Sequence, residues 1–475
     1  MAPSFGTSGL RGLVTELTPD LVTGYIHAFL STLSGCDTLF VGRDLRASSP
    51  EIAACVIDAA RAAGVHAVPC GALPTPALAL AAMHAKAAAV MVTGSHIPAD
   101  RNGLKFYTPA GEISKADEAA ISAAYTANTR LTAALPATLT DAAEAATAAY
   151  AARYIEAFGL TALKGLRIGI YRHSSVARDL LQEVFCALGA EVIPLGHSET
   201  FLPIDTEAIS DEMRAQLRDW CSTHALDAIV STDGDADRPM LTAASGAVIA
   251  GDILGVLTAR FLGAQQIVTP ISSNDMVRRL PEFTQVTLTR IGSPFVIAAM
   301  QEILAADPTA KPIGFEASGG FLLGFPASAP AQGSAQDIAA PLEPLLTRDS
   351  LLPLIVPLLA ARKAGKDLAA LIADLPPCFT AADRIQGINA DKAAAFLNRL
   401  IDSNPARRAF FEPFGTIKSH DLTDGLRLDF ESGDVIHLRP SGNAPEFRIY
   451  AQSGTQESAR VLVAAAMKAV SAEVL

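Results

Sequence analysis

Residues 227–238 read Asp-Ala-Ile-Val-Ser-Thr-Asp-Gly-Asp-Ala-Asp-Arg, a short apolar run that leads into three acidic residues at alternate positions. A run of this kind, bounded by Gly and Asp, predicts a buried β-strand that ends in a polar loop. The pattern recurs, with Ala-rich segments of helical length between the runs. The expected strands cover residues 38–42, 87–94, 166–171, 227–233, 266–270 and 311–314. Strands that alternate with helices favour open α/β sheets, whose ligands bind beyond the carboxyl ends of the strands.

The last hundred residues follow a different pattern. Residues 425–430 and 434–439 alternate polar and apolar side chains around a turn at residues 431–433. A further run at residues 446–452 precedes a helix with an apolar stripe that starts at Gln456. Consecutive hairpin strands followed by a helix predict an α+β domain at the C-terminal end.

The chain of 475 residues is long enough for several domains. We expect three similar α/β domains with mixed, mainly parallel sheets, at residues 1–152, 153–249 and 250–375, and a C-terminal α+β domain at residues 376–475. Ala- and Thr-rich residues 119–152 predict helices that close the first domain. Pro376 and Pro377 mark the entry to the last domain.

Composition excludes two classes of protein. The formal net charge is −12, aromatic residues make up 6%, and the sequence has no Lys/Arg block, so a nucleic-acid partner is not expected. The apolar run at residues 351–361 is too short to span a membrane and contains Pro353 and Pro357, which predicts a buried core segment instead. The six cysteines show no CxxC spacing and no leader peptide is evident, which indicates a cytoplasmic protein with reduced, structural thiols.

The acidic loop predicts a metal site. Its carboxylates are Asp233, Asp235 and Asp237. Oxygen ligands at this density suit Mg²⁺ or Ca²⁺. Alternate spacing would put all three carboxylates on one side of an extended segment, and Gly234 and Ala236 leave room for the backbone to curl around an ion. An EF-hand is excluded, because Arg238 and Ala244 stand where that loop needs Gly and Glu. Arg238 favours an anionic ligand shared with the metal. The alternative is an acidic loop that is simply solvated.

A serine follows a second predicted strand. Residues 93–98 read Thr-Gly-Ser-His-Ile-Pro, so that Ser95 stands behind a glycine at a strand end. A serine placed in this way can act as a nucleophile or carry a phosphate, and it can equally cap a helix. We interpret His96 as a hydrogen-bonding residue rather than a base.

A third loop pairs a carboxylate with a hydroxyl. Residues 314–320 read Gly-Phe-Glu-Ala-Ser-Gly-Gly, with Glu316 and Ser318 two residues apart. Together these side chains can accept from and donate to neighbouring sugar hydroxyls. The alternative is a flexible turn with a solvated glutamate.

A fourth loop carries two arginines. Residues 439–448 read Arg-Pro-Ser-Gly-Asn-Ala-Pro-Glu-Phe-Arg, between two strands of the C-terminal domain. Arg439 and Arg448, with the backbone amides of the turn, would suit a dianionic phosphate. A tight turn with incidental surface arginines is the alternative.

These four loops follow Phe-Gly-Thr-Ser-Gly-Leu-Arg-Gly at residues 5–12, and in this order they resemble the α-D-phosphohexomutase family over nearly the whole chain. Members of that family carry T-[AG]-S-H, D-G-D-x-D-R, G-E-x-S-G and R-P-S-G-T-x-P loops on four domains around one central cleft. The resemblance is greatest to bacterial phosphomannomutases and phosphoglucomutases.

The resemblance implies a role for each matching residue. Ser95 would carry the phosphate, and one of its phosphate oxygens would share Mg²⁺ with Asp233, Asp235 and Asp237. Other implied catalytic positions are His96, the cations Arg11 and Arg238, and Lys105, which is a candidate proton carrier. The implied substrate-binding residues are Glu316, Ser318, Arg439, Ser441, Gly442, Asn443 and Arg448.

The sequence departs from the family pattern at three loops. Ile97 stands where the serine loop usually has Asn, and Asn443 replaces a Thr of the phosphate loop. In many relatives the sugar loop ends in His, a candidate acid/base group, whereas this chain has Gly320. Phe315 precedes Glu316 where the family has Gly.

The implied reaction is reversible phosphoryl transfer between C6 and C1 of a hexose phosphate, through phosphoserine and a hexose 1,6-bisphosphate. Mannose 6-phosphate is the expected substrate, with glucose phosphate and glucosamine phosphate as alternatives. Two alternatives from other functional classes are a Mg²⁺-dependent sugar phosphatase and a non-catalytic protein that binds sugar phosphates. We expect a small-molecule substrate, no nucleic-acid or membrane partner, and a monomer or weak dimer.

Overall fold

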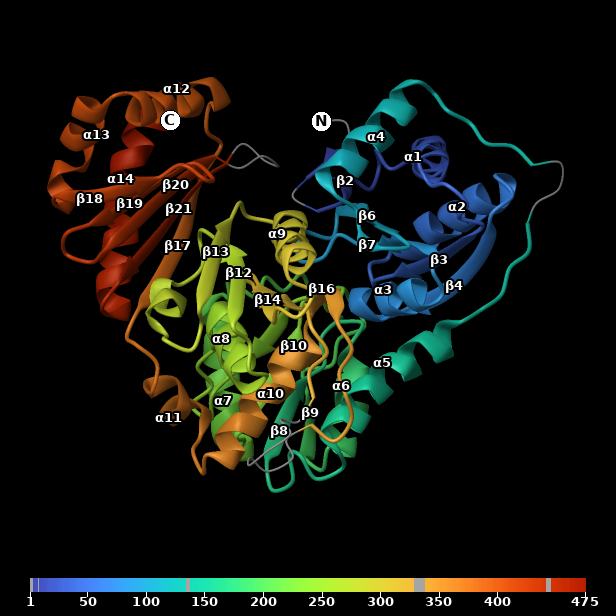
Figure 1. Ribbon diagram of the computed structural model, residues 1–475, viewed down its shortest axis with the longest axis horizontal. Helices are drawn as coiled ribbons and strands as arrows, with labels where there is room; N and C mark the ends of the chain where they lie inside the picture. Colours follow the sequence, from blue (N-terminus) through green and yellow to red (C-terminus); the bar gives the residue numbers. More distant parts are fainter. Residues whose placement is uncertain (1–2, 7, 134–136, 329–337, 441–445) are drawn as a thin grey trace.

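The structure is a computed structural model, and it describes residues 3–6, 8–133, 137–328, 338–440 and 446–475. Four separate sheets follow one another along the chain, each with its own helices. Figure 1 shows them in an arc, with the blue N-terminal sheet and the red C-terminal sheet at its two ends and the green and yellow sheets between them. The expected fold class is confirmed: three mixed α/β units precede a C-terminal antiparallel unit.

The first sheet is covered by helices on both faces. Its strands in spatial order are β1 (Ser4–Phe5), β2 (Leu10–Leu13), β6 (Arg101–Thr108), β5 (Ala88–Val92), β3 (Thr38–Arg43) and β4 (His66–Ala72), with β7 (Gly111–Glu112) beside β6. The helices are α1 (Pro19–Ser31), α2 (Ser49–Ala62), α3 (Thr75–His84), α4 (Lys115–Thr126) and α5 (Ala143–Phe158). β3 and β5 are parallel neighbours, so the polar segments that follow them emerge at one edge of the sheet.

The second and third sheets have the same design. The second has the order β11 (Pro239–Leu241), β10 (Ala228–Thr232), β8 (Arg167–Tyr171) and β9 (Glu191–Leu195), with helices α6 (Arg178–Ala187) and α7 (Asp211–His224). The third has the order β13 (Gln285–Thr289), β12 (Gln266–Pro270), β14 (Pro312–Phe315), β15 (Phe321–Leu323) and β16 (Leu345–Asp349), with α8 (Gly251–Phe261), η1 (Asp275–Arg279), α9 (Ser293–Ala306) and α10 (Leu351–Lys363). Parallel pairs form the centre of each sheet and antiparallel strands its edge.

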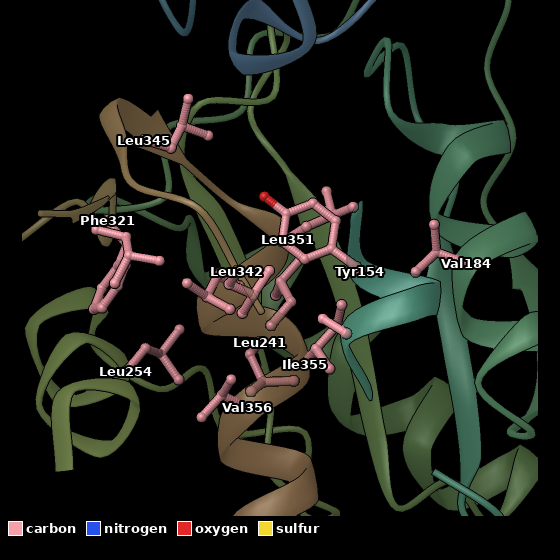
Figure 2. Packing of buried hydrophobic residues seen from close by; sticks show 14 of the residues in the cluster. Tyr154, Val184, Leu241, Leu254, Phe321, Leu342, Leu345, Leu351, Ile355 and Val356 are labelled. Carbon is pink, nitrogen blue, oxygen red and sulfur yellow. The ribbon is translucent and has the colours of Figure 1, made fainter. Parts of the chain in front are cut away.

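Helix α10 lies at the centre of a core shared by the first three sheets. Leu351, Ile355 and Val356 are fully buried, and Figure 2 shows them between α8 on one side and α6 on the other. The apolar run at residues 351–361 is therefore a buried core segment, as expected, but its prolines do not break it: Pro357 lies inside helix α10. Because this cluster also includes Tyr154 of α5, the first three units share one apolar core.

The C-terminal unit has a core of its own. Its antiparallel order is β17 (Phe379–Gln386), β21 (Glu446–Ser453), β20 (Val435–Pro440), β19 (Leu426–Phe430) and β18 (Ile417–Asp421). Its helices are α12 (Ala390–Asp402), α13 (Asn404–Phe411), η2 (Glu412–Phe414) and α14 (Gln456–Val474), and α11 (Leu368–Ala373) precedes it. Gln452 attaches the unit to the third sheet by donating from Nε2 to the Ser273 carbonyl at 2.9 Å.

The predicted strands agree with the structure to within about two residues at each end, and residues 266–270 coincide with β12. The division at residues 152, 249 and 375 stays a prediction, and the first of these positions falls within α5. Among the described residues, no helix combines the length and the hydrophobicity that crossing a bilayer requires. All six cysteines are described and none forms a disulfide.

Candidate active site

Ser95 stands in a left-handed turn directly after β5. Its φ is +53°, and its backbone N–H donates to Thr93 Oγ1 at 2.8 Å. The next described element after it is strand β6, which starts at Arg101, so Ser95 caps no helix and that alternative is wrong. The buried hydroxyl instead donates to Asp233 Oδ2 at 2.6 Å, from one sheet to the next. The serine of the first unit is thus held against the acidic loop of the second.

Arg46 and Asp44 hold this turn in place, and neither was singled out from the sequence. The Arg46 guanidinium donates to four backbone carbonyls of the serine loop, those of Ser95, Ile97, Pro98 and Arg101, at 2.6 to 2.9 Å. Asp44 accepts from Arg46 Nε at 3.1 Å and from Thr93 Oγ1 at 2.8 Å. A Cβ on Gly94 would lie 2.6 Å from Arg46 Cζ, which explains the glycine before the serine. The sequence signal that could have identified them is their position, because Asp44 and Arg46 are charged residues shortly after the strand predicted at residues 38–42.

Arg46→Ala is expected to loosen the first domain. The substitution leaves Asp44 buried without its ion pair, and breaking one partner of a buried pair costs about 3–5 kcal/mol. Native-state hydrogen exchange of the β3 and β5 amides should show a loss of protection of this size. Arg101→Ala, an exposed arginine at the end of the same loop, is the control and should change protection by about 0.5 kcal/mol or less. Equal protection in the two variants would contradict the role of Arg46 in holding the serine loop.

Asp233, Asp235 and Asp237 converge within one buried site. One ligand oxygen from each lies within 4.8 Å of the others, and all three side chains are 0 to 1% exposed. The loop is not the extended segment that alternate spacing suggests: it coils, with Ala236 at a φ of +59°. The expected gathering of the three carboxylates is present, but a tight turn produces it.

The free carboxylate oxygens suit a divalent cation. Oδ1 of Asp235 and Oδ1 of Asp237 are buried and have no hydrogen-bond partner in the part of the chain that the structure describes. Burial, with the two neighbouring carboxylates, raises the pKa of Asp233 well above its usual value. Buried carboxylates are stable as anions only beside positive charge. The loop could therefore bind a metal ion, and its all-oxygen donor set suits Mg²⁺.

Lys105 lies against this loop from strand β6. Its Nζ is 2.5 Å from Asp235 Oδ2 and 2.6 Å from Asp237 Oδ2, and its side chain is buried. Arg348 Nη2 lies 2.7 Å from the same Asp237 oxygen. Burial alone would raise the pKa of Asp237, but Arg348 and Lys105 outweigh burial and lower it. The two cations therefore hold the Oδ2 atoms of Asp235 and Asp237. Their Oδ1 atoms accept no hydrogen bond from the described residues, although Arg238 Nε lies 4.0 Å from Asp237 Oδ1.

Further cations crowd the same place. Arg11 Nη1 reaches the Gly94 carbonyl at 3.4 Å, and burial together with Arg238 lowers the pKa of Arg11 to about 10. Burial and the same two arginines also lower the pKa of His96, whose Nδ1 lies 3.3 Å from Ser95 Oγ. His96 is thus a neutral hydrogen-bonding partner of the serine, as expected. Guanidinium groups gathered so closely favour an anionic ligand between them.

The sugar loop adjoins the acidic loop through Arg348. Glu316 and Ser318 are 7% and 3% exposed, and Glu316 Oε2 accepts from Arg348 Nη1 at 3.1 Å. Ser318 Oγ is buried and has no hydrogen-bond partner among the described residues. The alternative of a turn with a solvated glutamate is therefore wrong, because Glu316 is buried and ion-paired. Arg348 was not singled out from the sequence, although Thr347-Arg348-Asp349 follows a short apolar run.

The phosphate loop is described only at its two ends. Arg439 on β20 and Arg448 on β21 are directly paired across the two strands. Arg439 Nε lies 2.9 Å from Asp424 Oδ2, beside a pocket of about 280 Å³ whose lining includes Arg290. The predicted binding residues between the two strands lie outside the described residues: Ser441, Gly442 and Asn443. The geometry therefore shows the two arginines side by side but not the turn between them.

Known proteins are similar to this chain over its whole length. A phosphomannomutase of Sinorhizobium fredii is 44% identical over 476 aligned positions, which cover 98% of both chains. The chain belongs to the phosphoglucomutase/phosphomannomutase family. A phosphomannomutase of Salmonella muenchen is 40% identical and covers 96% of this chain and 93% of its own. A phosphoglucosamine mutase of Salinispora arenicola is 29% identical, with coverage of 97% and 96%.

Two segments of the chain match models of individual domains of this family. Residues 2–132 match phosphoglucomutase/phosphomannomutase alpha/beta/alpha domain I, and residues 250–379 match alpha/beta/alpha domain III. A phosphoglucomutase/phosphomannomutase family protein of Burkholderia thailandensis has the same fold, with a TM-score of 0.75 and 20% identity over 98% of this chain and 97% of that one. A putative phosphomannomutase of Thermus thermophilus also gives a TM-score of 0.75, with 24% identity and 99% coverage of both chains.

Proposed function

We propose that this member of the phosphoglucomutase/phosphomannomutase family interconverts a hexose 6-phosphate and the corresponding hexose 1-phosphate, with Ser95 as the phosphate carrier. The observation that supports the proposal most directly is the 2.6 Å hydrogen bond from Ser95 Oγ to Asp233 Oδ2. This bond joins a serine hydroxyl that follows β5 of the first sheet to a buried group of three carboxylates that follows β10 of the second sheet.

In the first half of the reaction, the free hydroxyl of the substrate attacks the phosphorus of phospho-Ser95. A bond forms from the substrate oxygen to phosphorus and the bond from phosphorus to Ser95 Oγ breaks. The proton of the attacking hydroxyl ends on Ser95 Oγ, which leaves as a neutral hydroxyl. Lys105 is the candidate to move that proton, because its Nζ contacts Asp235 and Asp237 of the acidic loop, where Ser95 Oγ is also bound. The product of this step is a hexose 1,6-bisphosphate and free Ser95.

The second half reverses the first at the other end of the sugar. The bisphosphate turns around, Ser95 Oγ attacks its second phosphate, and the monophosphate isomer is released. One site can serve both ends because its cations bind phosphate in either orientation. Arg11 contacts the serine loop at the Gly94 carbonyl, and Arg238 lies beside Asp237 of the acidic loop. Arg439 and Arg448 would hold the phosphate that is not being transferred.

The acidic loop supplies the metal ligands in this proposal. Asp233, Asp235 and Asp237, with an oxygen of phospho-Ser95, would hold one Mg²⁺. A bound Mg²⁺ neutralises charge that develops on the transferred phosphoryl group. Lys105 and Arg348 fix the Oδ2 atoms of the loop, which orients the remaining oxygens before any ligand arrives.

Mannose phosphate is the proposed substrate, and glucose phosphate is an alternative. The two relatives at 44% and 40% identity are named phosphomannomutases. Glu316 and Ser318 would bind neighbouring sugar hydroxyls. Ser318 Oγ is buried and makes no hydrogen bond to the described residues, so it can still donate to and accept from a ligand. We further propose that the enzyme works as a monomer or weak dimer in the cytoplasm, where six unpaired thiols stay reduced.

A coupled assay with a catalytic amount of glucose 1,6-bisphosphate tests the reaction. Mannose 1-phosphate, glucose 1-phosphate and glucosamine 1-phosphate are compared as substrates, and inorganic phosphate is measured in parallel. Formation of mannose 6-phosphate without phosphate release is the expected result. Phosphate release without an isomer would identify a Mg²⁺-dependent phosphatase and overturn the proposal.

Arg439→Ala is expected to lower kcat/KM for the hexose 1-phosphate by about tenfold to a hundredfold. Arg439 would give a charge-assisted, fork-shaped contact to the phosphate that is not transferred, and contacts to charged groups are worth about 1.5–3 kcal/mol. Its present partner Asp424 can accept from other donors, including the Ile291 N–H at 3.0 Å. Steady-state kinetics of the variant give the measurement. The control variant is Arg384→Ala, which removes an exposed arginine from β17 of the same sheet. Equal kinetics of the two variants would contradict the role of Arg439 in binding the phosphate.

A further inference from the structure

Arg348 joins two loops that are otherwise separate parts of the site. Its Nε and Nη2 donate to Asp237 Oδ2 at 3.1 and 2.7 Å, and its Nη1 donates to Glu316 Oε2 at 3.1 Å. The side chain is 5% exposed, so these contacts are shielded from water. One guanidinium therefore links an acidic-loop carboxylate to the sugar-loop carboxylate.

Gly320 gives Arg348 the space for this link. Strands β15 and β16 are antiparallel neighbours, and the Arg348 side chain crosses over Gly320, which precedes β15. A Cβ built on Gly320 would lie 2.6 Å from Arg348 Cδ and 2.8 Å from Cγ. These atoms are in the middle of the side chain, so it could not keep its path beside any larger residue. The glycine at the end of the sugar loop and the arginine on β16 thus depend on each other.

The shape of the arginine matters more than its charge. A guanidinium is a planar fork that can donate to two carboxylates in different directions, whereas an ammonium is a single point charge. Lysine at this position could reach one of the two carboxylates and would leave the other buried without its donor. Glu316 has only this one ion pair among the described residues, so its orientation depends on Arg348.

We propose that Arg348 is a positioning residue that fixes Glu316 for binding of the sugar, and that Gly320 is a glycine because Arg348 occupies the space of its side chain. The inference rests on the proposed function, since Glu316 is taken there as a ligand of the sugar hydroxyls. It extends that function by making the sugar contact dependent on a residue that need not touch the sugar. Arg348 also orients Asp237, so one side chain sets the geometry of both loops.

Arg348→Lys tests the fork with the charge retained. Binding of mannose 1-phosphate is measured by calorimetry in a Ser95→Ala background, in which no turnover takes place. We expect Arg348→Lys to raise the Kd by about tenfold to a hundredfold. In the single Arg348→Lys variant, which keeps Ser95, KM should rise by a larger factor than kcat falls. Unchanged Kd and KM in Arg348→Lys would overturn the proposal, because charge alone would then suffice.

Gly320→Ala tests the same contact from the other side. The backbone at residue 320 is not in the left-handed region, so alanine itself causes no strain. Alone, Gly320→Ala should raise the Kd about as much as Arg348→Ala does. In the double variant Gly320→Ala/Arg348→Ala the two effects should not add, because the alanine then has no arginine to displace. Fully additive effects would overturn the dependence of one residue on the other.

Failure of the inference and failure of the proposed function give different results. If the Ser95→Ala protein does not bind mannose 1-phosphate, glucose 1-phosphate or glucosamine 1-phosphate, the proposed function and the inference both fall. If it binds one of them and the Arg348 and Gly320 variants bind it equally well, only the inference falls. Gly454→Ala, at a glycine with open space around it, is the control for the glycine substitution and should leave the Kd unchanged.

Discussion

Ser95→Ala is expected to lower mutase turnover by roughly four orders of magnitude or more, because removal of a covalent carrier removes the reaction path itself. The unmutated enzyme should carry a phosphate on Ser95, which intact-protein and peptide mass spectrometry would detect. Added glucose 1,6-bisphosphate should restore activity to dephosphorylated enzyme but not to the alanine variant. The hydroxyl is small and lies in a loop, so the fold should persist.

A matched serine separates chemistry from packing. Ser231 is buried on β10, two residues before the acidic loop, and its Oγ donates to the Tyr171 carbonyl at 2.8 Å. Ser231→Ala removes one buried hydrogen bond, as Ser95→Ala does, and should keep most of the activity. Full activity of an enzyme that never carries phosphate on Ser95 would refute the carrier role.

The strands that the sequence predicts lie inside their sheets rather than at the edges, but β6 and β15 also lie inside a sheet and were not predicted. β10 and β12 each contain an Ile-Val pair and are buried along nearly their whole length, because both faces of a strand inside the sheet are covered. Edge strands lack that signal. β9 contains Pro194 and is largely unburied, and β17 reads Phe-Thr-Ala-Ala-Asp-Arg-Ile-Gln with only one buried side chain. Their pairing depends on the neighbouring strand rather than on their own pattern.

The site divides in a similar way. Ser95, the three aspartates, Glu316 and Ser318 could be predicted because each stands in a short loop of distinctive composition after a strand. Arg46 and Arg348 could not, because what they bind is decided by tertiary structure. Arg46 donates to backbone carbonyls more than forty residues away, and Arg348 joins Asp237 and Glu316 from a third strand. A single sequence does not show which buried arginine meets which loop.

Removal of the divalent cation is expected to abolish turnover reversibly. Exhaustive treatment with a chelator should stop the reaction, and Mg²⁺ should restore it, because the three buried carboxylates offer an all-oxygen site. Asp235→Asn should be inactive at ordinary Mg²⁺ concentrations, since it removes one charge and replaces one oxygen of the site with an amide nitrogen. Mn²⁺ binding, followed by calorimetry, gives a readout besides activity and should be lost in the same variant.

A buried carboxylate outside the loop is the control for this substitution. Asp252, at the start of α8, accepts from the Asn274 N–H at 2.9 Å, and its burial raises its pKa to about 6. Asp252→Asn should leave Mn²⁺ binding intact, because both Asp252 oxygens bind backbone N–H groups, those of Ile253 and Asn274, and lie outside the acidic loop. Ca²⁺ should bind the aspartate loop but support little turnover, because its larger and looser coordination displaces the phosphoryl group from in-line geometry. Undiminished activity after chelation, or in Asp235→Asn, would show that the loop binds no catalytic metal and that Lys105 and Arg348 alone balance its charge.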